Sequence, residues 1–505
     1  MKKTRTLLLI AGTLISSALL AQTAVINKQQ LARKIDSAVQ KIMEKIPVVP
    51  GMAISVVDDN GPLLAKGYGW ANKEAGIRAD ENTLFYIASN TKAFMGLVAA
   101  MLDGEKKILL DSPFKKYFTS LHFKNEISDK ISYRHLLTHT SGLVNNALVF
   151  RMAVSGDIEK ETMLRIFSDA TIAKTEYGIF HYNNLGYNIY GLALQEYLHK
   201  KWQDVLQERI FVPLGMGRTT SYISLAEKNK WPIAAPYTAY GEKGLTKLSF
   251  VKADNTMQSA GGIITTASDI SKWLQVQITQ GKLNNKQIFP TALIKATQTG
   301  FAPYENEPGP APAGKYALGW YIGKWENEDF IFHSGGYPGY KSNISFMPGK
   351  KIGLAIFVNE SSIGENVAEI MATYIYDLVK GKAGADKSFT KSVEELEARH
   401  LKTAESFQRS IADRAKRTSQ LTLPLNAYTG TYRHDRFGDI VVKEENNVLA
   451  VRFGNMHAVS TPFTEKETIR VELLPGSGKV IYFKSGDDGK MNGLTYDGSE
   501  YKKVK

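Results

Sequence analysis

The spacing of hydrophobic positions changes within the first seventy residues of the chain. Between residues 27 and 46 the apolar residues recur every three or four positions, at Leu31, Ile35, Val39, Ile42 and Ile46. This spacing predicts an amphipathic helix that ends before Pro47. Residues 52–57 are then a short apolar run, residues 59–61 form a turn sequence, and residues 63–70 can return as a partner strand. A helix followed by an antiparallel hairpin indicates a mixed α/β domain.

From residue 89 to about residue 276 the pattern is mainly helical, and strand patterns return after it. Helices are predicted over residues 133–137, 184–198 and 269–278, and strands over residues 320–324, 330–333, 343–347 and 353–358. A closing helix is predicted over residues 367–379. The two ends of this region therefore supply a sheet, and its middle supplies helices.

The character of the chain changes again after residue 380. Residues 381–424 are polar and charged without a sustained apolar stripe, which favours a helical or partly ordered linker. Residues 425–505 alternate short strands with turns, which is typical of a small all-β unit. We therefore expect a main domain over residues 22–380, a linker over 381–424 and a β-rich domain over 425–505.

Residues 1–21 have the pattern of a secretory signal peptide. Lys2, Lys3 and Arg5 precede an apolar run that extends to Leu20, and cleavage is expected near Ala21. The run is shorter than the ~18–20 residues that span a bilayer, so an uncleaved anchor is the less favoured alternative. The expected location is a bacterial periplasm or the exterior, with no integral membrane segment after the leader is removed.

Composition excludes several classes of function. The chain has no cysteine, which rules out disulfides, thiol catalysis and cysteine-ligated zinc. The net charge is +13 over 505 residues, but the lysines are scattered among acidic residues without an arginine-rich run. Solvated faces explain this charge better than nucleic-acid binding does.

The first candidate for chemistry is Ser89, which is expected to cap a helix, with Lys92 one turn later. Burial or the positive end of the helix dipole would disfavour an ammonium on Lys92 and leave an amine that can act as a base. The spacing alone is not specific, because the same Ser-x-x-Lys pattern also occurs at Ser112, Ser249, Ser388 and Ser499. A capping serine with a solvated lysine is the structural alternative.

Tyr182 and Asn184 form a second candidate pair, two residues apart and just before a predicted helix. The phenol can relay a proton, and the amide can orient Lys92 or bind a substrate carbonyl. The alternative is a buried tyrosine beside an N-capping Asn184.

A third candidate, His333-Ser334-Gly335-Gly336, lies at the end of a predicted strand. Its small residues would let a substrate backbone run beside the strand, and the N–H groups of Gly336 and Ser89 could form an oxyanion hole. A strand that simply ends in a Gly-Gly turn is the alternative. A similar pattern at His139–Gly142 lies in the helical block and is interpreted as a chance match.

Together these three elements resemble those of the serine β-lactamase and DD-peptidase superfamily, specifically its class C-like branch. That branch uses Ser-x-x-Lys, Tyr-x-Asn and Lys/His-x-Gly in this order. The flanking segments Gly67–Asn72, Leu136–Leu143, Ser259–Gly262 and Thr265–Asp269 match as well. The similarity runs from about residue 30 to residue 380, and residues 428–505 more weakly resemble a β-rich domain often appended to such hydrolases.

The resemblance implies an α/β sandwich, in which helices flank an antiparallel sheet, beside an all-helical lobe, with the small β domain appended. Ser89 would form an acyl-enzyme, Lys92 and Tyr182 would share the base role, and Asn184 would orient the reacting groups. The N–H groups of Ser89 and Gly336 would hold the oxyanion. His333, Ser334 and Gly335 would shape the end of the site that receives a substrate carboxylate. No cofactor or metal is implied.

Histidine at position 333 departs from the lysine usual in β-lactamases. A histidine is only partly charged near pH 7 and holds a carboxylate less firmly, which argues against efficient β-lactam hydrolysis. Histidine at this position is familiar among the DD-peptidases, D-amino-acid peptidases and esterases of the family, so the resemblance implies a D-amino-acid peptide or a small ester as the substrate. A β-lactamase, or a penicillin-binding sensor without turnover, is the alternative. The sequence does not decide among amide, ester and lactam substrates, and it does not give the oligomeric state.

Overall fold

The structure is a computed structural model that describes residues 27–123, 129–144, 146–154, 158–169, 171–172, 176–249, 252–307 and 310–504. The predicted signal peptide, residues 1–21, lies outside the described residues. Across the part of the chain that is described, no helix has both the length and the apolar character needed to cross a membrane.

A nine-stranded antiparallel sheet organises the main domain, with the strand order β12-β13-β14-β15-β16-β17-β1-β2-β3. Strand β1 lies between β2 and β17, so the N-terminal hairpin and the later strands join in one sheet, as predicted. The strands are β1 (Gly51–Asp58), β2 (Gly61–Asn72), β3 (Ile77–Arg78), β12 (Ala302–Tyr304), β13 (Gly314–Tyr316), β14 (Tyr321–Trp325), β15 (Glu328–Tyr337), β16 (Tyr340–Met347) and β17 (Ile352–Val358).

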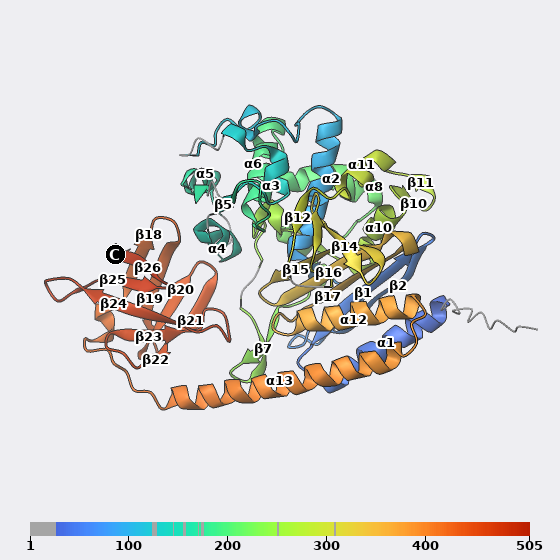
Figure 1. The fold of residues 1–505 in the computed structure, drawn as a ribbon. Helices are drawn as coiled ribbons and strands as arrows, with labels where there is room; N and C mark the ends of the chain where they lie inside the picture. The colour runs from blue at the N-terminus through green and yellow to red at the C-terminus, as the bar shows by residue number, and fades with distance from the viewer. Residues whose placement is uncertain are drawn as a thin grey trace, which may run out of the picture.

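Helices cover both faces of this sheet (Figure 1). On one face, Met52, Ile54 and Val56 of β1 pack in a core with α1 (Lys28–Lys45) and α12 (Gly364–Val379). On the other face, Ala53 and Val57 belong to a core that includes α2 (Thr91–Gly104) and α10 (Ala267–Ile278). Because successive residues of a strand point to opposite faces, β1 is apolar almost throughout. The predicted sandwich is confirmed.

The all-helical lobe contains α3 (Tyr133–Leu137), α4 (Asn146–Val154), α5 (Lys160–Ser168) and α6 (Leu185–Leu198). The smaller elements are α7 (Trp202–Leu206), α8 (Val212–Leu214), α9 (Ile223–Lys228), α11 (Thr291–Thr297), β4 (Phe85–Tyr86), β5 (Leu143–Val144), β6 (Thr171–Ile172), β7 (Tyr237–Gly241), β8 (Gly244–Lys247), β9 (Ile264–Thr265), β10 (Lys282–Leu283) and β11 (Lys286–Gln287).

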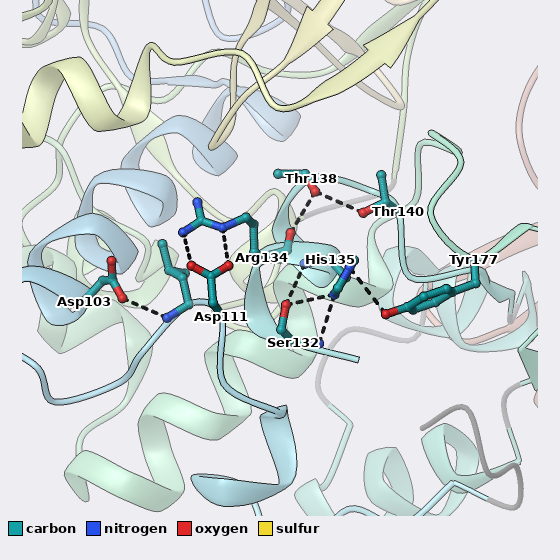
Figure 2. Close-up of polar contacts among 9 residues, drawn as sticks. Asp103, Asp111, Ser132, Arg134, His135, Thr138, Thr140 and Tyr177 are labelled. Carbon is teal, nitrogen blue, oxygen red and sulfur yellow. Dashed lines mark hydrogen bonds and ion pairs between the residues drawn. The ribbon is translucent and has the colours of Figure 1, made fainter. Parts of the chain in front are cut away.

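Polar contacts around α3 fix the chain that leads to the site (Figure 2). Ser132 caps α3 and lies 2.8 Å from Nδ1 of His135, in a reciprocal capping arrangement. This serine–histidine contact is accounted for by the helix cap. At the other end of the helix, the Thr138 hydroxyl donates to the carbonyl of Arg134 at 2.8 Å. The chain then turns through His139, whose φ of 61° lies in the left-handed region.

The start of α2 corrects the sequence prediction for Ser89. A 3₁₀ turn spans Ala88–Asn90, and α2 begins only at Thr91, so Ser89 lies one residue before the N-cap position and makes no cap. The φ of Ala88 is 46°, which sets this turn apart from the helix. The Asn90 amide instead donates to Ser342 Oγ of β16 at 2.8 Å, which ties the turn to the sheet.

The segment after residue 380 contains a helix, as its prediction allowed, but this helix has an apolar stripe that was not predicted. The helix is α13 (Ala385–Ala415), and its first half buries Ala385, Phe389, Val393, Leu396 and His400 on one face. The four apolar residues pack in the core formed with α1 and α12, and the ring centroids of Phe389 and Tyr374 lie 4.5 Å apart. The prediction that this segment lacks an apolar stripe is therefore wrong for its first half. The charged residues that cover the other faces obscured the stripe.

The C-terminal domain is all β, with the order β21-β20-β19-β18-β26-β25-β24-β23-β22. The strands at the two ends of this order, β21 and β22, are separated only by Ser460, so the sheet curls back on itself. Its strands are β18 (Gly430–His434), β19 (Gly438–Glu445), β20 (Val448–Phe453), β21 (Met456–Val459), β22 (Thr461–Pro462), β23 (Thr468–Val471), β24 (Lys479–Ser485), β25 (Met491–Tyr496) and β26 (Ser499–Lys503).

Candidate active site

Ser89 and Lys92 face each other across the junction between the 3₁₀ turn and α2. Lys92 Nζ lies 3.0 Å from Ser89 Oγ. The lysine side chain is fully buried, whereas Ser89 is partly exposed. A buried amine next to an accessible hydroxyl is the geometry expected of a nucleophile and its base.

Burial lowers the pKa of Lys92 well below its ordinary value. Two carbonyl oxygens also lie 2.8 Å from Nζ: Oδ1 of Asn184 and the main-chain oxygen of Ala260. A neutral amine has two hydrogens and one lone pair. Because both oxygens can only accept, they take the two hydrogens, and the lone pair is left for the Ser89 hydroxyl.

The environment of Lys92 differs from that of the lysines in the other Ser-x-x-Lys segments. Lys115 forms an ion pair with Asp129, Lys391 pairs with Glu395 along α13, and Lys252 donates to the carbonyl of Ser221. Ser499 and Lys502 lie on strand β26, where residues three apart point to opposite faces.

The side chain of Asn184 is free to accept a hydrogen bond from Lys92 because the side chain of the preceding residue, Asn183, caps α6. The side-chain oxygen of Asn183 accepts from the N–H groups of Leu185 at 3.1 Å and Gly186 at 3.3 Å. Asn184 itself makes no capping hydrogen bond. Asn184 occupies the N-cap position of α6, but the alternative in which its side chain caps the helix is therefore excluded by the geometry.

The ring of Tyr182 lies beside the amine, with its centroid 5.0 Å from Lys92 Nζ. Burial raises the pKa of the Tyr182 phenol, and the nearby Ser89 hydroxyl opposes that shift. The phenol oxygen is buried and has no well-formed hydrogen bond to any described residue. Since leaving a buried hydroxyl unpaired costs free energy, this atom is available for a substrate or a transferring proton.

His333 lies in β15, with only 1% of its surface exposed. Its Nδ1 lies 2.6 Å from the carbonyl of Ser334, and its Nε2 lies 3.1 Å from the Tyr316 hydroxyl. Burial, followed by the proximity of Lys92, lowers the pKa of His333 to about 3. The ring is therefore neutral at pH 7, and both of its nitrogens are already engaged.

Ser334, Gly335 and Gly336 continue β15 along an edge of the sheet. The pairing of β14 with β15 ends at Phe332, so β16 is the only described strand that pairs with residues 333–337. Ser334 and Gly336 are exposed, whereas Gly335 is buried. A Cβ at Gly335 would lie 2.2 Å from the carbonyl oxygen of Ile87, so only glycine lets β15 come this close to the turn that carries Ser89.

The structure brings His139 into the site, although the sequence pattern was interpreted as a chance match. Its ring centroid lies 4.5 Å from that of Tyr182 and 4.6 Å from that of Tyr316. Its carbonyl accepts from the N–H of His181 at 2.8 Å, and its Nδ1 accepts from the N–H of Asn183 at 3.3 Å. Burial lowers the pKa of His139 well below its usual value. The flanking segment Leu136–Leu143, which contains His139, was the sequence signal that could have placed this residue in the site.

Ala260 and Tyr316 were also missed as contributors to the site. Ala260 acts through a main-chain carbonyl, and only the segment match over Ser259–Gly262 marked its position. No pattern marked Tyr316. Among the described residues, no three His, Asp or Glu side chains converge as a metal site would require.

Most of the chain is similar to known proteins. The Beta-lactamase family model matches residues 35–374. The unguisins hydrolase ungD of Aspergillus violaceofuscus is 24% identical over 83% of this chain and 76% of its own length. Protein flp of Staphylococcus aureus strain MW2 is 24% identical over 65% of this chain, and the match spans 63% of its length, less than two thirds.

Two solved structures share the fold. The octameric penicillin-binding protein homologue from Pyrococcus abyssi superposes with a TM-score of 0.58 and 23% identity, over 93% of this chain and 99% of its own. The D-amino acid amidase from Ochrobactrum anthropi SV3 superposes with a TM-score of 0.58 and 20% identity, over 69% of this chain and 98% of its own.

Proposed function

The chain belongs to the beta-lactamase family, and from this membership we propose that it is an exported serine hydrolase that cleaves an amide or ester bond through a covalent acyl-enzyme. One observation carries the proposal. Lys92 is buried, both hydrogens of its neutral amine have acceptors, and its lone pair is left for the Ser89 hydroxyl 3.0 Å away. A solvated lysine beside a capping serine would show neither burial nor these partners.

The proposed reaction begins with attack of Ser89 Oγ on the acyl carbon. The Ser89 proton moves to Lys92 Nζ, directly or through the Tyr182 phenol, and the N–H groups of Ser89 and Gly336 stabilise the oxyanion. The amine or alcohol leaves with that proton as the carbonyl re-forms. A water molecule then attacks the ester on Ser89 and gives a proton to the same base. The base passes this proton to Ser89 Oγ as the bond to the acyl carbon breaks, which releases the acid and restores the serine and the neutral amine.

The edge of β15 supports an extended acyl donor as the substrate. Residues 333–337 have a strand neighbour on one side only, and two of them are glycines, so a peptide backbone can approach the open side closely. A D-amino-acid peptide is our first choice, and a small ester is the second. The fold shared with a D-amino acid amidase is consistent with the first.

The alternative is a β-lactamase, or a penicillin-binding sensor that acylates without turnover. Neutral His333 offers no cation to the carboxylate of a β-lactam, and its nitrogens are engaged by Tyr316 and Ser334. This observation favours amide or ester substrates. The predicted signal peptide supports export to a periplasm or the exterior.

Covalent labelling tests the proposal. A fluorophosphonate probe should label the wild-type protein, and Ser89→Ala should abolish labelling and turnover. Ser388→Ala is the matched control, because Ser388 belongs to another Ser-x-x-Lys match, on α13. Labelling that survives Ser89→Ala would refute the proposed nucleophile. A panel of a nitrophenyl ester, a D-Ala-D-Ala peptide and a chromogenic cephalosporin then separates the substrate classes, and an acyl-enzyme that never deacylates would favour the sensor.

A further inference from the structure

The last turn of α4 offers three consecutive main-chain carbonyls to three different parts of the molecule. The carbonyl of Met152 accepts from the N–H of Met257 at 3.0 Å, and that of Ala153 accepts from the Tyr337 hydroxyl at 2.8 Å. The carbonyl of Val154 accepts from the N–H of Asn455 at 2.7 Å. The final carbonyls of a helix have no partners within the helix, so these hydrogen bonds satisfy groups that need external donors.

The first of these bonds leads to Lys92. Met257 precedes the 3₁₀ turn Gln258–Ala260, and Ala260 presents the carbonyl that accepts from Lys92. Asn188 reinforces the connection, because its side-chain oxygen accepts from the N–H of Ala260 at 3.0 Å and its amide lies 3.5 Å from the sulfur of Met152. The position of α4 therefore influences the position of the Ala260 carbonyl, which accepts a hydrogen bond from Lys92.

The second bond leads to the substrate edge and to Ser89. Tyr337 directly follows Gly336 in β15, so its anchoring on α4 fixes the end of that strand. The ring of Tyr337 also packs edge-on against Tyr86 at 4.6 Å, three residues before Ser89. Both sides of the candidate active site are thus connected to the same helix.

The third bond leads to the C-terminal domain. Asn455 lies in the turn between β20 and β21, and the ring of Phe150 on α4 lies 5.0 Å from Phe453 and 6.0 Å from Phe437. Arg151 donates to the carbonyl of Arg436 at 3.2 Å. Figure 1 shows α4 between the curled C-terminal sheet and the rest of the helical lobe.

We propose that the C-terminal domain is a positioning element for the acylation site, which it reaches through α4. A helix of nine residues is too short to be stable alone in water, so packing on both of its sides determines its position. Met152 contacts Asn188 of α6 in the main domain, whereas Phe150 and Arg151 contact the β domain. The kinetic part of this inference rests on the proposed function, whereas its structural part does not.

The test removes the aromatic contact from the side of the β domain. Phe437→Ala truncates a partly exposed ring, and the control Tyr482→Ala truncates an exposed ring of the same domain. Hydrogen exchange in the full-length protein should become faster for residues 257–261 and 335–337 in Phe437→Ala but not in Tyr482→Ala. Arg151→Ala weakens the same contact from the helix side and should give the same pattern, with Arg409→Ala on α13 as its control. Unchanged exchange at both segments in both test variants would overturn the proposal.

Acylation kinetics provide the second measurement. We expect the rate of covalent labelling of Ser89 to fall about tenfold in Phe437→Ala. The ascending limb of the pH profile for labelling should move to higher pH in this variant, because water that enters the loosened site solvates the charged form of Lys92 and raises its pKa. A β domain that only stabilises the fold would lower the melting temperature without moving that limb, which would overturn the proposal. If Ser89 labels in no variant, the proposed function fails, and the exchange experiment still decides the structural part.

Discussion

The hydroxyl of Tyr316, at the end of β13, lies 3.1 Å from Nε2 of His333 in β15, and both residues are buried. Nδ1 of the same ring lies 2.6 Å from the carbonyl of Ser334, which can only accept a hydrogen bond. The proton therefore resides on Nδ1, and Nε2 accepts from Tyr316. His333 thus contributes a neutral ring whose two hydrogen bonds help to fix the position of β15.

His333 should remain neutral across the physiological pH range. Its pKa is lowered to about 3, mainly by burial, so the imidazole resonances should not titrate between pH 5 and pH 8. Because the unfolded chain binds this proton below about pH 6.5, the contribution of His333 makes the free energy of unfolding fall as the pH decreases from about 6.5 to about 3. NMR of labelled histidine checks the first point, with His333→Gln to assign the signal. A midpoint near 6.5 for His333 would contradict it.

Lys92→Met should stabilise the fold at neutral pH while it abolishes acylation. Folding forces Lys92 to lose its proton, because burial lowers its pKa far below that of the unfolded chain. The unfolded state therefore binds more protons, and wild-type stability should rise with pH toward 10, by up to about 1.4 kcal/mol per pH unit. Denaturant unfolding of both proteins between pH 7 and pH 10 measures this slope. A stability difference between them that does not change with pH would contradict it.

Tyr182→Phe should reduce acylation by roughly 10²–10⁴-fold, because it removes a group placed to relay a proton. It should leave stability within about 1 kcal/mol of the wild type, since the phenol oxygen is buried without a well-formed hydrogen bond. Pre-steady-state ester cleavage and thermal unfolding measure the two effects. Tyr304→Phe is the control. The Tyr304 hydroxyl donates to the carbonyl of Ala311 at 3.3 Å and is not one of the proposed catalytic groups. A large stability loss without a rate effect would assign Tyr182 a structural role.

Asn184→Asp should move the ascending limb of the acylation profile to higher pH. A carboxylate at this position, 2.8 Å from Nζ, would favour the charged form of Lys92 and raise its pKa. Activity at pH 7 should fall and partly recover at alkaline pH. Asn183→Asp, next to it in sequence, caps α6 and should not move the limb. A pH profile that stays in place in Asn184→Asp would show that Asn184 does not control the base.

Replacement by alanine should affect stability differently at the adjacent glycines Gly335 and Gly336 of β15. A Cβ at Gly335 would lie 2.2 Å from the carbonyl of Ile87 and 2.4 Å from Ser342 Oγ, whereas at Gly336 the closest atom is the flexible Lys341 Nζ at 3.3 Å. Gly335→Ala should cost about 1–3 kcal/mol or more and displace the turn that carries Ser89. Gly336→Ala should fold normally and keep its N–H. Thermal unfolding separates the two, and equal melting temperatures would contradict the close approach.

Much of the fold was predictable from local patterns. The hairpin formed by β1 and β2 and the helices α1 and α10 have regular apolar spacing, and the structure confirms them. Ser89 was misplaced as a helix cap because residue type alone does not reveal that Ala88 has a positive φ or that a 3₁₀ turn precedes α2. The stripe on α13 was missed because Phe389 and Val393 are separated by exposed charged residues.

The candidate site was only partly predictable. Ser89, Lys92, Tyr182 and Asn184 were named from ordered motifs, and the structure brings these four together. The role of Ala260 depends on a main-chain oxygen, which has no sequence signature. The contact between Tyr316 and His333 depends on the register of β13 with β14 and of β14 with β15, which neither residue encodes alone. Tertiary packing decides such contacts.

The uneven burial of α13 determines where the chain can be cut. A chain that ended at residue 380 would uncover the apolar surface of α1 and α12 that Phe389, Val393 and Leu396 cover, and it should aggregate. The second half of the helix is largely exposed and leads to residues 416–424, which lack regular structure. Limited proteolysis should therefore first cleave near residues 416–424 and leave a fragment that retains the first half of α13.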